Sequence, residues 1–412
     1  MLPEGWQSLV LGDVFSFKNG LNGEKSLYGA GAKFVNVMDV FRGPRLRHSE
    51  IVGEMAVSPR QLTEFAVKQG DVLFNRTSET DDEIALSTVY LDTEPAVFGG
   101  FVIRARPNVN GLDQDFCIYG LQADNIRREM IRRGQGAIRS NIGQADLATV
   151  PILLPSLPEQ RKIAEILSTW DAAIAAQERL IANAKRQKKA LMQTLLPTGA
   201  HPPKKRLPGF SGEWKIARLG TLADLFAGGT PSTNRPEYWG GHVPWMNSGE
   251  INLREIYEVE GRITDVGLKN SSAKMVPINS ILVALAGQGT TRGKVAISRV
   301  PLCTNQSVAT IVPGPELYAD YLFHDLDGRY DELRSMSLGD GGRGGLNLAV
   351  LRSVAIMAPT VEEQHAIATV LATADADIKG LKTQLSTLHQ EKSALMQQLL
   401  TGKRRVQLEE AA

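Results

Sequence analysis

The chain has 412 residues, enough for two or three domains, and its 42% hydrophobic content is typical of packed globular proteins rather than of disordered ones. It contains no apolar run of about 18 residues and no charged-then-apolar leader, so we expect a soluble, cytoplasmic protein without membrane contact. Two cysteines are too few for a disulfide framework, and a formal net charge of +1 leaves nucleic-acid binding to be decided by local clusters.

The first globular block covers residues 1–150 and is predicted to be α/β without a regular alternation of strands and helices. Short apolar runs that follow glycine-containing turns, at residues 72–74 and 101–103, predict strands. A helix that carries four arginines is predicted over residues 121–133.

A central repeat helix is predicted within residues 151–199, after a proline-rich entry at 151–158. Its apolar residues recur at alternating spacings of four and three, the pattern of a coiled-coil seam. The predicted seam consists of Ile163, Leu167, Trp170, Ile174, Ile181, Ala184, Leu191 and Leu195. Roughly 40 helical residues reach about 60 Å at about 1.5 Å each. Such a helix usually buries its stripe on a partner helix; two separate core helices in two domains are the alternative.

The second half of the chain repeats the first. A linker at 200–213 leads to a second block at 214–355 and a distal repeat helix at 356–405. At a constant offset of 204, 17 of the 42 residues from Pro155 to Leu196 are identical in the second copy. The sequence therefore predicts an internal duplication in which the helices stayed alike while the blocks diverged toward different ligands.

The two repeat helices supply partners for each other. For antiparallel, symmetric pairing we expect facing seam residues whose numbers sum to 562. Ile163 would then face Leu399, and Ile181 would face Leu381.

Two identical lysines, Lys188 and Lys392, are polar residues within this apolar seam. They could set the register of the pairing, or their ammonium groups could snorkel to the surface; we favour snorkelling. In the expected register Lys392 approaches Trp170, which suggests a cation–π contact.

No catalytic constellation is recognisable in the sequence. The six histidines are scattered, and neither a nucleophile elbow nor a methyltransferase tetrapeptide of the Asn/Asp-Pro-Pro-aromatic kind is present. Residues 285–295 look like a phosphate loop, but Gly287 and Gly289 leave five and three residues before Gly-Lys instead of four. We therefore expect neither nucleotide hydrolysis nor a metal centre in this chain.

Polar, glycine-rich loops at corresponding places in both blocks suggest a binding face instead. Asn and Arg side chains read adenine and guanine edges in the major groove of DNA, although each loop taken singly could equally be a solvated surface turn. The predicted DNA-contacting residues are Lys18, Asn19, Asn75, Arg76, Thr77, Arg139 and Asn141 in the first block, and Thr230, Gln288, Thr290, Thr291, Arg292, Lys294, Asn305 and Arg343 in the second.

Four short motifs carry a resemblance to a known family. Residues 154–160 and 358–364 precede Ile-Ala at the helix starts, and Ala-Leu-Met-Gln at 190–193 and 394–397 comes near the helix ends. The Gly-Lys-Val turn at 293–295 and the Leu-Phe-Asn-Arg run at 73–76 also resemble family signatures. In this order the whole chain resembles the specificity subunit of type I restriction-modification systems.

This resemblance implies an α+β protein with two globular α/β target-recognition domains separated by two long antiparallel coiled-coil helices. Each domain would read one half of a split, asymmetric double-stranded DNA target. The helices would space the domains and dock two methyltransferase subunits, which restriction and translocation subunits join. The chain would be non-catalytic and would bind no cofactor; S-adenosylmethionine, ATP and Mg²⁺ are expected on the partner subunits, which methylate adenine. A coiled-coil scaffold whose blocks bind proteins and an autonomous methyltransferase are the competing interpretations.

Overall fold

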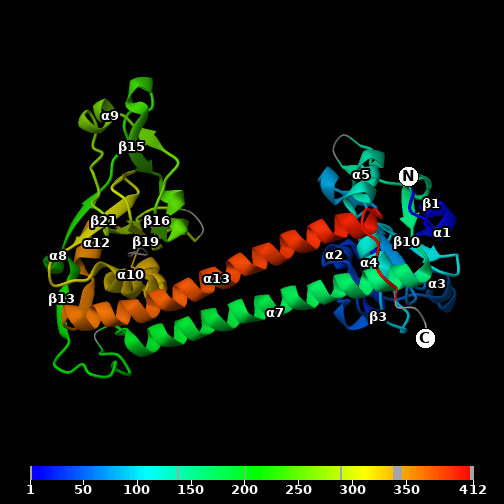
Figure 1. Ribbon diagram of the computed structural model, residues 1–412, viewed down its shortest axis with the longest axis horizontal. Helices are drawn as coiled ribbons and strands as arrows, with labels where there is room; N and C mark the ends of the chain where they lie inside the picture. Colours follow the sequence, from blue (N-terminus) through cyan, green and yellow to red (C-terminus); the bar gives the residue numbers. More distant parts are fainter. Residues whose placement is uncertain (1, 137–138, 200, 288–289, 337–345, 409–412) are drawn as a thin grey trace. The chain divides into compact units, whose positions relative to one another are not determined.

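The computed structural model describes residues 2–136, 139–199, 201–287, 290–336 and 346–408 (Figure 1). The chain divides into two compact units. The first unit contains residues 1–178 and 383–412, and the second contains residues 179–382. Within the described ranges, no helix combines the length and the apolar character needed to cross a membrane.

The first unit holds a five-stranded sheet, a three-stranded sheet and two short ribbons. Its strands are β1 (Gln7–Val10), β2 (Phe15–Asn19), β3 (Tyr28–Val35), β4 (Arg45–Leu46), β5 (Glu54–Met55), β6 (Val72–Asn75), β7 (Thr77–Ser78), β8 (Ser87–Tyr90), β9 (Val97–Phe98), β10 (Val102–Pro107), β11 (Ser140–Asn141) and β12 (Pro151–Leu154). The large sheet has the order β2-β10-β6-β8-β4, the small sheet β5-β3-β9, and the ribbons are β1-β12 and β11-β7. Every residue of β6 and β8 is buried, so these strands form the centre of the unit.

Short helices cover this sheet system. They are α1 (Leu11–Val14), η1 (Lys25–Leu27), α2 (Val37–Phe41), η2 (His48–Glu50), α3 (Pro59–Glu64), η3 (Asp81–Glu83), α4 (Gln114–Gly120), α5 (Asp124–Arg133) and α6 (Gln144–Ala148). The predicted arginine-bearing helix is α5, and its predicted start at Leu121 is wrong. Leu121 is a buried core residue that caps the end of α4, and the new helix begins only at Asp124.

The second unit repeats this architecture. Its strands are β13 (Lys215–Arg218), β14 (Ala223–Ala227), β15 (Trp239–Met246), β16 (Glu255–Ile256), β17 (Arg262–Ile263), β18 (Ile281–Ala284), β19 (Val295–Ser298), β20 (Cys303–Thr304), β21 (Val308–Pro313) and β22 (Ala355–Ala358). Its helices are α8 (Leu219–Leu222), η4 (Pro236–Tyr238), η5 (Ser248–Leu253), α9 (Asp265–Lys269), α10 (Ala319–Gly328), α11 (Tyr330–Ser335) and α12 (Leu348–Ser353). The large sheet has the order β14-β21-β18-β19-β16, the small sheet β17-β15-β20, and the ribbon is β13-β22.

The large sheets, the small sheets and the terminal ribbons of the two units correspond in topology, whereas the β7–β11 ribbon has no counterpart among the described strands of the second unit. In both large sheets the last strand pairs in parallel and the other pairs are antiparallel. In both small sheets the central strand has one antiparallel and one parallel neighbour, with a register shift in the antiparallel pair. The predicted internal duplication is therefore confirmed, and it extends through the blocks although few of their residues are identical.

Two long helices, α7 (Leu157–Leu195) and α13 (Val361–Leu400), are shared by the units (Figure 1). Both ends of each helix enter a hydrophobic core. Ile163 and Leu167 of α7 pack in the core of the first unit with Leu399 of α13, and Ile367 and Leu371 of α13 pack in the core of the second. Full burial of an Ile or Leu side chain contributes about 1.5–3 kcal/mol, so these ends are firmly anchored.

A repeated glutamine at each helix start explains part of the sequence repeat. Gln160 donates to the carbonyls of Gly111 and Pro155 and accepts from the amide of Asp113. Gln364 makes the same three hydrogen bonds in the second unit, with Glu316, Pro359 and Tyr318. Because both glutamines are fully buried, these hydrogen bonds satisfy backbone groups that would otherwise be costly to bury.

The helices pair in the antiparallel register predicted from the repeat. In the first unit Asp171 bonds Lys392 and Gln177 bonds Gln384, and in the second unit Lys188 bonds Asp375. The two residue numbers of each pair sum to 561 or 563, within one of the expected 562. The numbers rise along α7 as they fall along α13. Antiparallel pairing of the two helices is confirmed.

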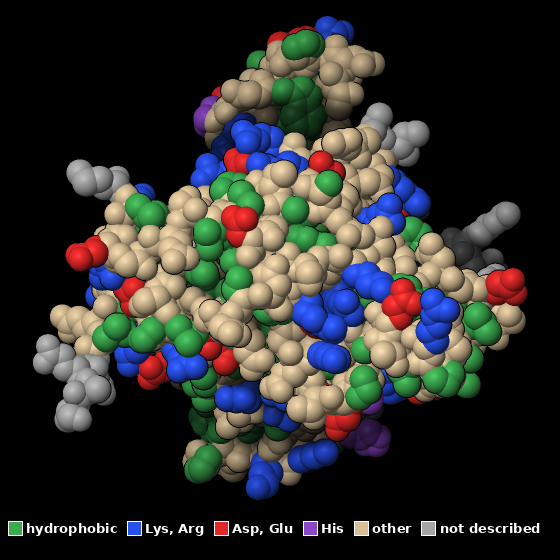
Figure 2. Space-filling view, turned by 90° about the vertical axis from the view of Figure 1, so that its right-hand side faces the viewer, with side chains coloured by type: hydrophobic (Ala, Val, Ile, Leu, Met, Phe, Trp, Pro, Cys, Tyr) green, Lys and Arg blue, Asp and Glu red, His purple; other side chains and the backbone are tan. Residues whose placement is uncertain are grey.

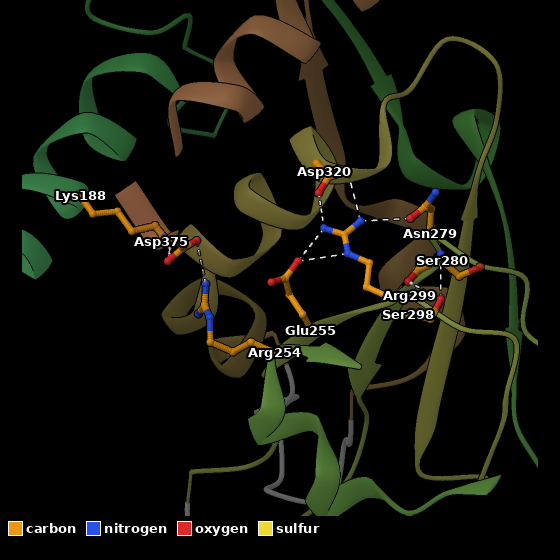
Figure 3. Close-up of polar contacts among 9 residues, drawn as sticks. All are labelled: Lys188, Arg254, Glu255, Asn279, Ser280, Ser298, Arg299, Asp320 and Asp375. Atoms are coloured by element: carbon orange, nitrogen blue, oxygen red, sulfur yellow. Dashed lines mark hydrogen bonds and ion pairs between the residues drawn. The ribbon is translucent and has the colours of Figure 1, made fainter. Parts of the chain in front are cut away.

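The expectation that the seam lysines snorkel is wrong. Lys188 is buried, with 7% of its surface exposed, and its Nζ lies 2.6 Å from both carboxylate oxygens of Asp375 (Figure 3). Lys392 lies 2.5 Å from Asp171 and 5.4 Å from the ring centroid of Tyr119, so its cation–π partner is Tyr119 rather than Trp170. Each ammonium turns toward the carboxylate of the facing helix because an unpaired buried charge is far costlier than a paired one.

Candidate nucleic-acid interface

In the first unit, the predicted contact loops meet at one end of the large sheet. Asn19 ends β2 and faces Ile103 of β10, and Asn75 ends β6 and faces Val102 of β10. The turn between β9 and β10 lies beside them, because the amide of Arg76 donates to the carbonyl of Phe101 at 2.8 Å. Antiparallel pairing thus brings the end of β2, the end of β6 and the start of β10 to the same edge.

The side chains at this end differ in what they can offer a ligand. Thr77 Oγ1 donates to Asn141 Oδ1 at 2.7 Å across the β7–β11 ribbon, which fixes both side chains near the surface. Arg139 is exposed and pairs with Glu79 at 3.2 Å. Among the residues that the structure describes, the partly exposed Arg76 side chain has no hydrogen-bond or ion-pair partner, so its donors are available.

Two predicted residues are less accessible than expected. Asn75 has no exposed surface, so a base edge cannot reach it unless β6 and β7 separate. The Nζ of Lys18 bonds Glu64 at 2.8 Å and lies 4.5 Å from the ring centroid of Phe65. The strand alternation that turns Lys18 toward α3 could not be read without the strand pairing.

The second unit brings its loops to the equivalent sheet end. Thr230 donates to Gln306 across the β14 and β21 loops, and the amide of Leu285 after β18 donates to the carbonyl of Ser307. The amide of Asn305 is held by the carbonyl of Met246 at 3.0 Å. The loops after β14 and β18 and the loop before β21 therefore converge, as their counterparts do in the first unit.

The turn before β19 borders a pocket of about 450 Å³ at this end. Lys294 donates to Asn252 at 2.6 Å, and Tyr330 donates to the carbonyl of Thr290 at 2.9 Å. Thr291 and Arg292 are partly exposed on the same turn. The predicted contact residues Gln288 and Arg343 lie outside the described residues.

Charge on the surface is mixed rather than uniformly basic. Figure 2 shows groups of Lys and Arg side chains with Asp and Glu side chains interspersed among them. Within the described ranges, no group of His, Cys, Asp and Glu side chains is arranged to hold a metal ion. Any attraction for a polyanion therefore comes from local clusters of cations, in keeping with the net charge of +1.

One constellation was missed by sequence reasoning: the aspartate on each helix also binds the recognition block. Asp171 accepts from Tyr119 of α4 at 2.7 Å and from Arg45 of β4 at 3.0 Å, in addition to Lys392. Burial raises the pKa of Asp171, whereas the hydrogen bonds from Lys392 and Tyr119 lower it. Together with the neighbouring charges these hydrogen bonds outweigh burial, so the pKa of Asp171 lies below its ordinary value. The only signal in the sequence was the identity of Asp171 and Asp375 in the repeat.

Asp375 occupies the same position in the second unit. It lies between Lys188 and Arg254, whose guanidinium is 3.8 Å away and also bonds Asp327 at 2.8 Å (Figure 3). Arg254 adopts a φ of 67°, which is uncommon for a residue other than glycine. Its backbone is held by two hydrogen bonds, from its amide to the carbonyl of Ile251 and from the amide of Ile297 to its carbonyl.

A neighbouring network stiffens the edge of the same sheet. Arg299 bonds Glu255 at 2.7 Å, Asn279 at 3.0 Å and Asp320 (Figure 3). Burial lowers the pKa of Arg299, but its hydrogen bonds with Asp320 and Glu255 more than offset this, and the net pKa is raised. Arg299, the residue after β19, thus joins β16 to α10, and Arg254 directly precedes β16.

His324 lies against this junction and gives the second unit a pH dependence. Burial, followed by the charge of Lys188, lowers the pKa of His324 to about 4. An unfolded histidine titrates near pH 6.5, so below that pH the unfolded chain binds a proton that the folded chain does not. Stability is therefore lost as the pH falls from about 6.5 toward 4.

We expect His324→Phe to remove part of this loss. Between pH 7 and pH 5 the free energy of unfolding should fall by roughly 1–2 kcal/mol less in the variant than in the parent, as measured by urea titration. His389→Gln, at an exposed position of α13, is the matched control and should keep the parent slope. An identical slope in the His324 variant would contradict this account.

Comparison with known proteins shows which family has this architecture. The model of the type I restriction modification DNA specificity domain matches the chain twice, over residues 3–186 and 211–390. The putative type I restriction enzyme MjaX specificity subunit of Methanocaldococcus jannaschii is 25% identical, over 98% of this chain and 95% of that protein. The EcoR124I/EcoR124II specificity subunit of Escherichia coli is 30% identical over 39% of this chain and 40% of that protein.

Solved structures show the same fold. The S subunit of a type I restriction-modification system from M. genitalium superposes with a TM-score of 0.56 at 15% identity, covering 96% of both chains. A chain from a study of complex assembly and conformational transition of the type I system gives 0.65 at 19% identity, covering 98% of this chain and all of the other. Because the family model covers both recognition blocks and most of both long helices, the chain belongs to the type I restriction-modification DNA specificity subunits, and its function is the recognition of a DNA target.

Proposed function

We propose that each unit reads one half of a bipartite, asymmetric DNA target. The observation that carries this proposal is the equivalence of the two sheet ends. One topology presents the ends of corresponding strands in both units, yet the side chains there differ: Arg76 and Phe101 in the first unit stand where Leu285 and Ser307 stand in the second. The same scaffold with different side chains suits two related tasks with different base sequences.

We further propose that α7 and α13 form the docking surface for two methyltransferase subunits. Much of each helix surface away from the seam is exposed, while the seam residues and the two lysine–aspartate ion pairs hold the pairing. Adenine methylation would take place on those partners, which would carry S-adenosylmethionine. Restriction and translocation subunits with ATP and Mg²⁺ would join this core. In this arrangement the present chain contributes recognition and assembly.

Exchange of the first block tests the half-site proposal. A chimaera in which residues 1–150 come from another specificity subunit is expected to change one half of the methylated sequence and leave the other half unchanged. The measurement is genome-wide mapping of methylated adenines in cells that express the chimaera with the methyltransferase. Altered bases in both halves would overturn the modular assignment.

The salt dependence of DNA binding distinguishes the proposed function from the alternative of a coiled-coil scaffold whose blocks bind proteins. If Lys and Arg side chains contact phosphates, log Kd for the reconstituted complex rises linearly with log salt, with a slope of about 0.9 for each phosphate neutralised. Two outcomes would favour a protein-binding scaffold. In one, the complex assembles through the helices but does not bind DNA; in the other, its affinity for DNA does not change with salt.

A further inference from the structure

The turn between β9 and β10 presents an aromatic ring to solvent at the sheet end of the first unit. All 12 phenylalanines lie in the described ranges, and Phe101 alone among them is exposed, with 63% of its surface accessible. It belongs to none of the hydrophobic clusters of the unit. Burying such a ring would contribute about 1.5–3 kcal/mol, so the fold gains nothing from holding it outside.

Three backbone hydrogen bonds hold this turn in place. The amide of Val102 donates to the carbonyl of Gly99 at 2.9 Å and closes the turn. The amide of Gly99 donates to Val35, and the carbonyl of Phe101 accepts from Arg76. The ring is therefore carried by a well-anchored turn rather than by a free loop.

Two glycines precede Phe101 in this turn. A Cβ on Gly99 would lie 2.6 Å from the ring of the buried Phe34, so packing excludes a side chain there, and a Cβ on Gly100 would displace the exposed side chain of Asn22. The one large side chain that these three residues present is therefore that of Phe101. Its backbone bonds Arg76, and Arg76 leads directly into the β7–β11 ribbon that carries the polar side chains of Thr77 and Asn141 at this sheet end.

An exposed ring among such donors and acceptors matches one feature of the major groove. Thymine offers a C5 methyl group beside its O4 acceptor, and apolar side chains, Phe included, contact that methyl group, while Arg and Asn bind the polar edges of guanine and adenine. Removing a methyl group and a ring edge from water together is favourable, and the contact distinguishes thymine from cytosine.

The second unit supplies an internal comparison. Its equivalent turn is closed by the hydrogen bond from Val308 to Asn305, and the residue before Val308 is Ser307, whose carbonyl accepts from Leu285 as that of Phe101 accepts from Arg76. The duplication thus keeps the turn and changes the side chain that it presents.

We propose that Phe101 contacts the 5-methyl group of a thymine in the half-site read by the first unit, and that the second unit makes no such contact at Ser307. This inference rests on the proposed function. It adds a specificity-determining residue, the base type that this residue reads, and an asymmetry between the half-sites.

The test combines deoxyuridine substitution with replacement of Phe101 in the reconstituted complex with methyltransferase. The target is first defined by methylation mapping. Each thymine of both half-sites is then replaced in turn by deoxyuridine, which lacks only the methyl group, and Kd is measured for the parent and for Phe101→Ala. One thymine of the first half-site is expected to show a three- to tenfold weaker Kd with deoxyuridine, and this factor should fall to about one in Phe101→Ala.

Control variants and outcomes separate the possibilities. Phe101→Leu keeps an apolar group and should retain part of the methyl effect, whereas Ser307→Ala should leave every deoxyuridine factor unchanged. The inference is overturned by a first half-site without a methyl-sensitive thymine, by a methyl effect that persists in Phe101→Ala, or by loss of methyltransferase assembly in that variant without DNA. Failure of the parent complex to bind its mapped target would instead overturn the proposed function.

Discussion

Insertion of one helical heptad into α7 alone, between Arg179 and Leu180, is expected to destabilise the protein by at least about 3 kcal/mol. The two helices would no longer keep their register in both units at once. Either the insert loops out and breaks α7, at a cost comparable to that of an interior proline, or one unit slides and loses the facing partners of its seam. The measurement is the midpoint of urea unfolding, together with co-purification of methyltransferase subunits.

A matching insertion in α13 is the decisive control. In the predicted register, in which facing seam residues sum to 562, a heptad between Lys382 and Thr383 lies opposite the insert in α7. The doubly extended protein should recover the parent unfolding midpoint while each long helix grows by about 10 Å. It should therefore assemble with methyltransferase but prefer a wider separation of the half-sites. Equal stability of the singly and doubly extended proteins would show that the helices do not depend on this pairing.

The second large effect concerns the ion pair between the buried Lys188 and the partly exposed Asp375 in the second unit. Asp375→Ala is expected to lower the free energy of unfolding by about 2–4 kcal/mol, because it leaves the ammonium of Lys188 and the strained Arg254 without their shared carboxylate. The lower part of the range for buried pairs applies because 35% of the Asp375 side chain is exposed. Chemical denaturation at pH 7 measures the change.

Removing both charges distinguishes the attraction between Lys188 and Asp375 from the free-energy cost of taking the two charges out of water. Lys188→Met, which replaces the ammonium by an apolar group of similar length, should cost less than Asp375→Ala, and the double variant should be more stable than Asp375→Ala alone. The exposed Lys189→Met is the matched control and should change stability by no more than about 0.5 kcal/mol. If the two single-variant effects simply add, Lys188 and Asp375 do not stabilise each other.

The long helices illustrate how far sequence reasoning reaches. The long helices lie inside the segments predicted for them, and those segments, 151–199 and 356–405, extend four to six residues beyond α7 and α13 at each end. Their antiparallel register followed from the heptad pattern and the repeat, because a symmetric pair must align equivalent seam residues. The two gaps left in the predicted seam of α7 are filled by Gln177 and Lys188, both buried, which periodicity of apolar residues could not reveal.

The contact residues show where sequence reasoning ends. Thr77 and Asn141 are 64 positions apart, and their hydrogen bond depends on the β7–β11 pairing. Asn75 has the side chain of a base reader but is buried, and Phe101 did not match a polar pattern although it is exposed. In each case accessibility is decided by neighbouring strands that are distant in the chain.

The sequence by itself determined the duplication, the order of blocks and helices, the register of the seam and the resemblance to a specificity subunit, because repeats and heptads are local patterns. Only the tertiary structure decided that Lys188 and Lys392 bind Asp375 and Asp171, and that Arg254 and Arg45 join the blocks to those same aspartates. These contacts link charges on different elements, and the cost of burying a charge is set by the partner that the fold places beside it.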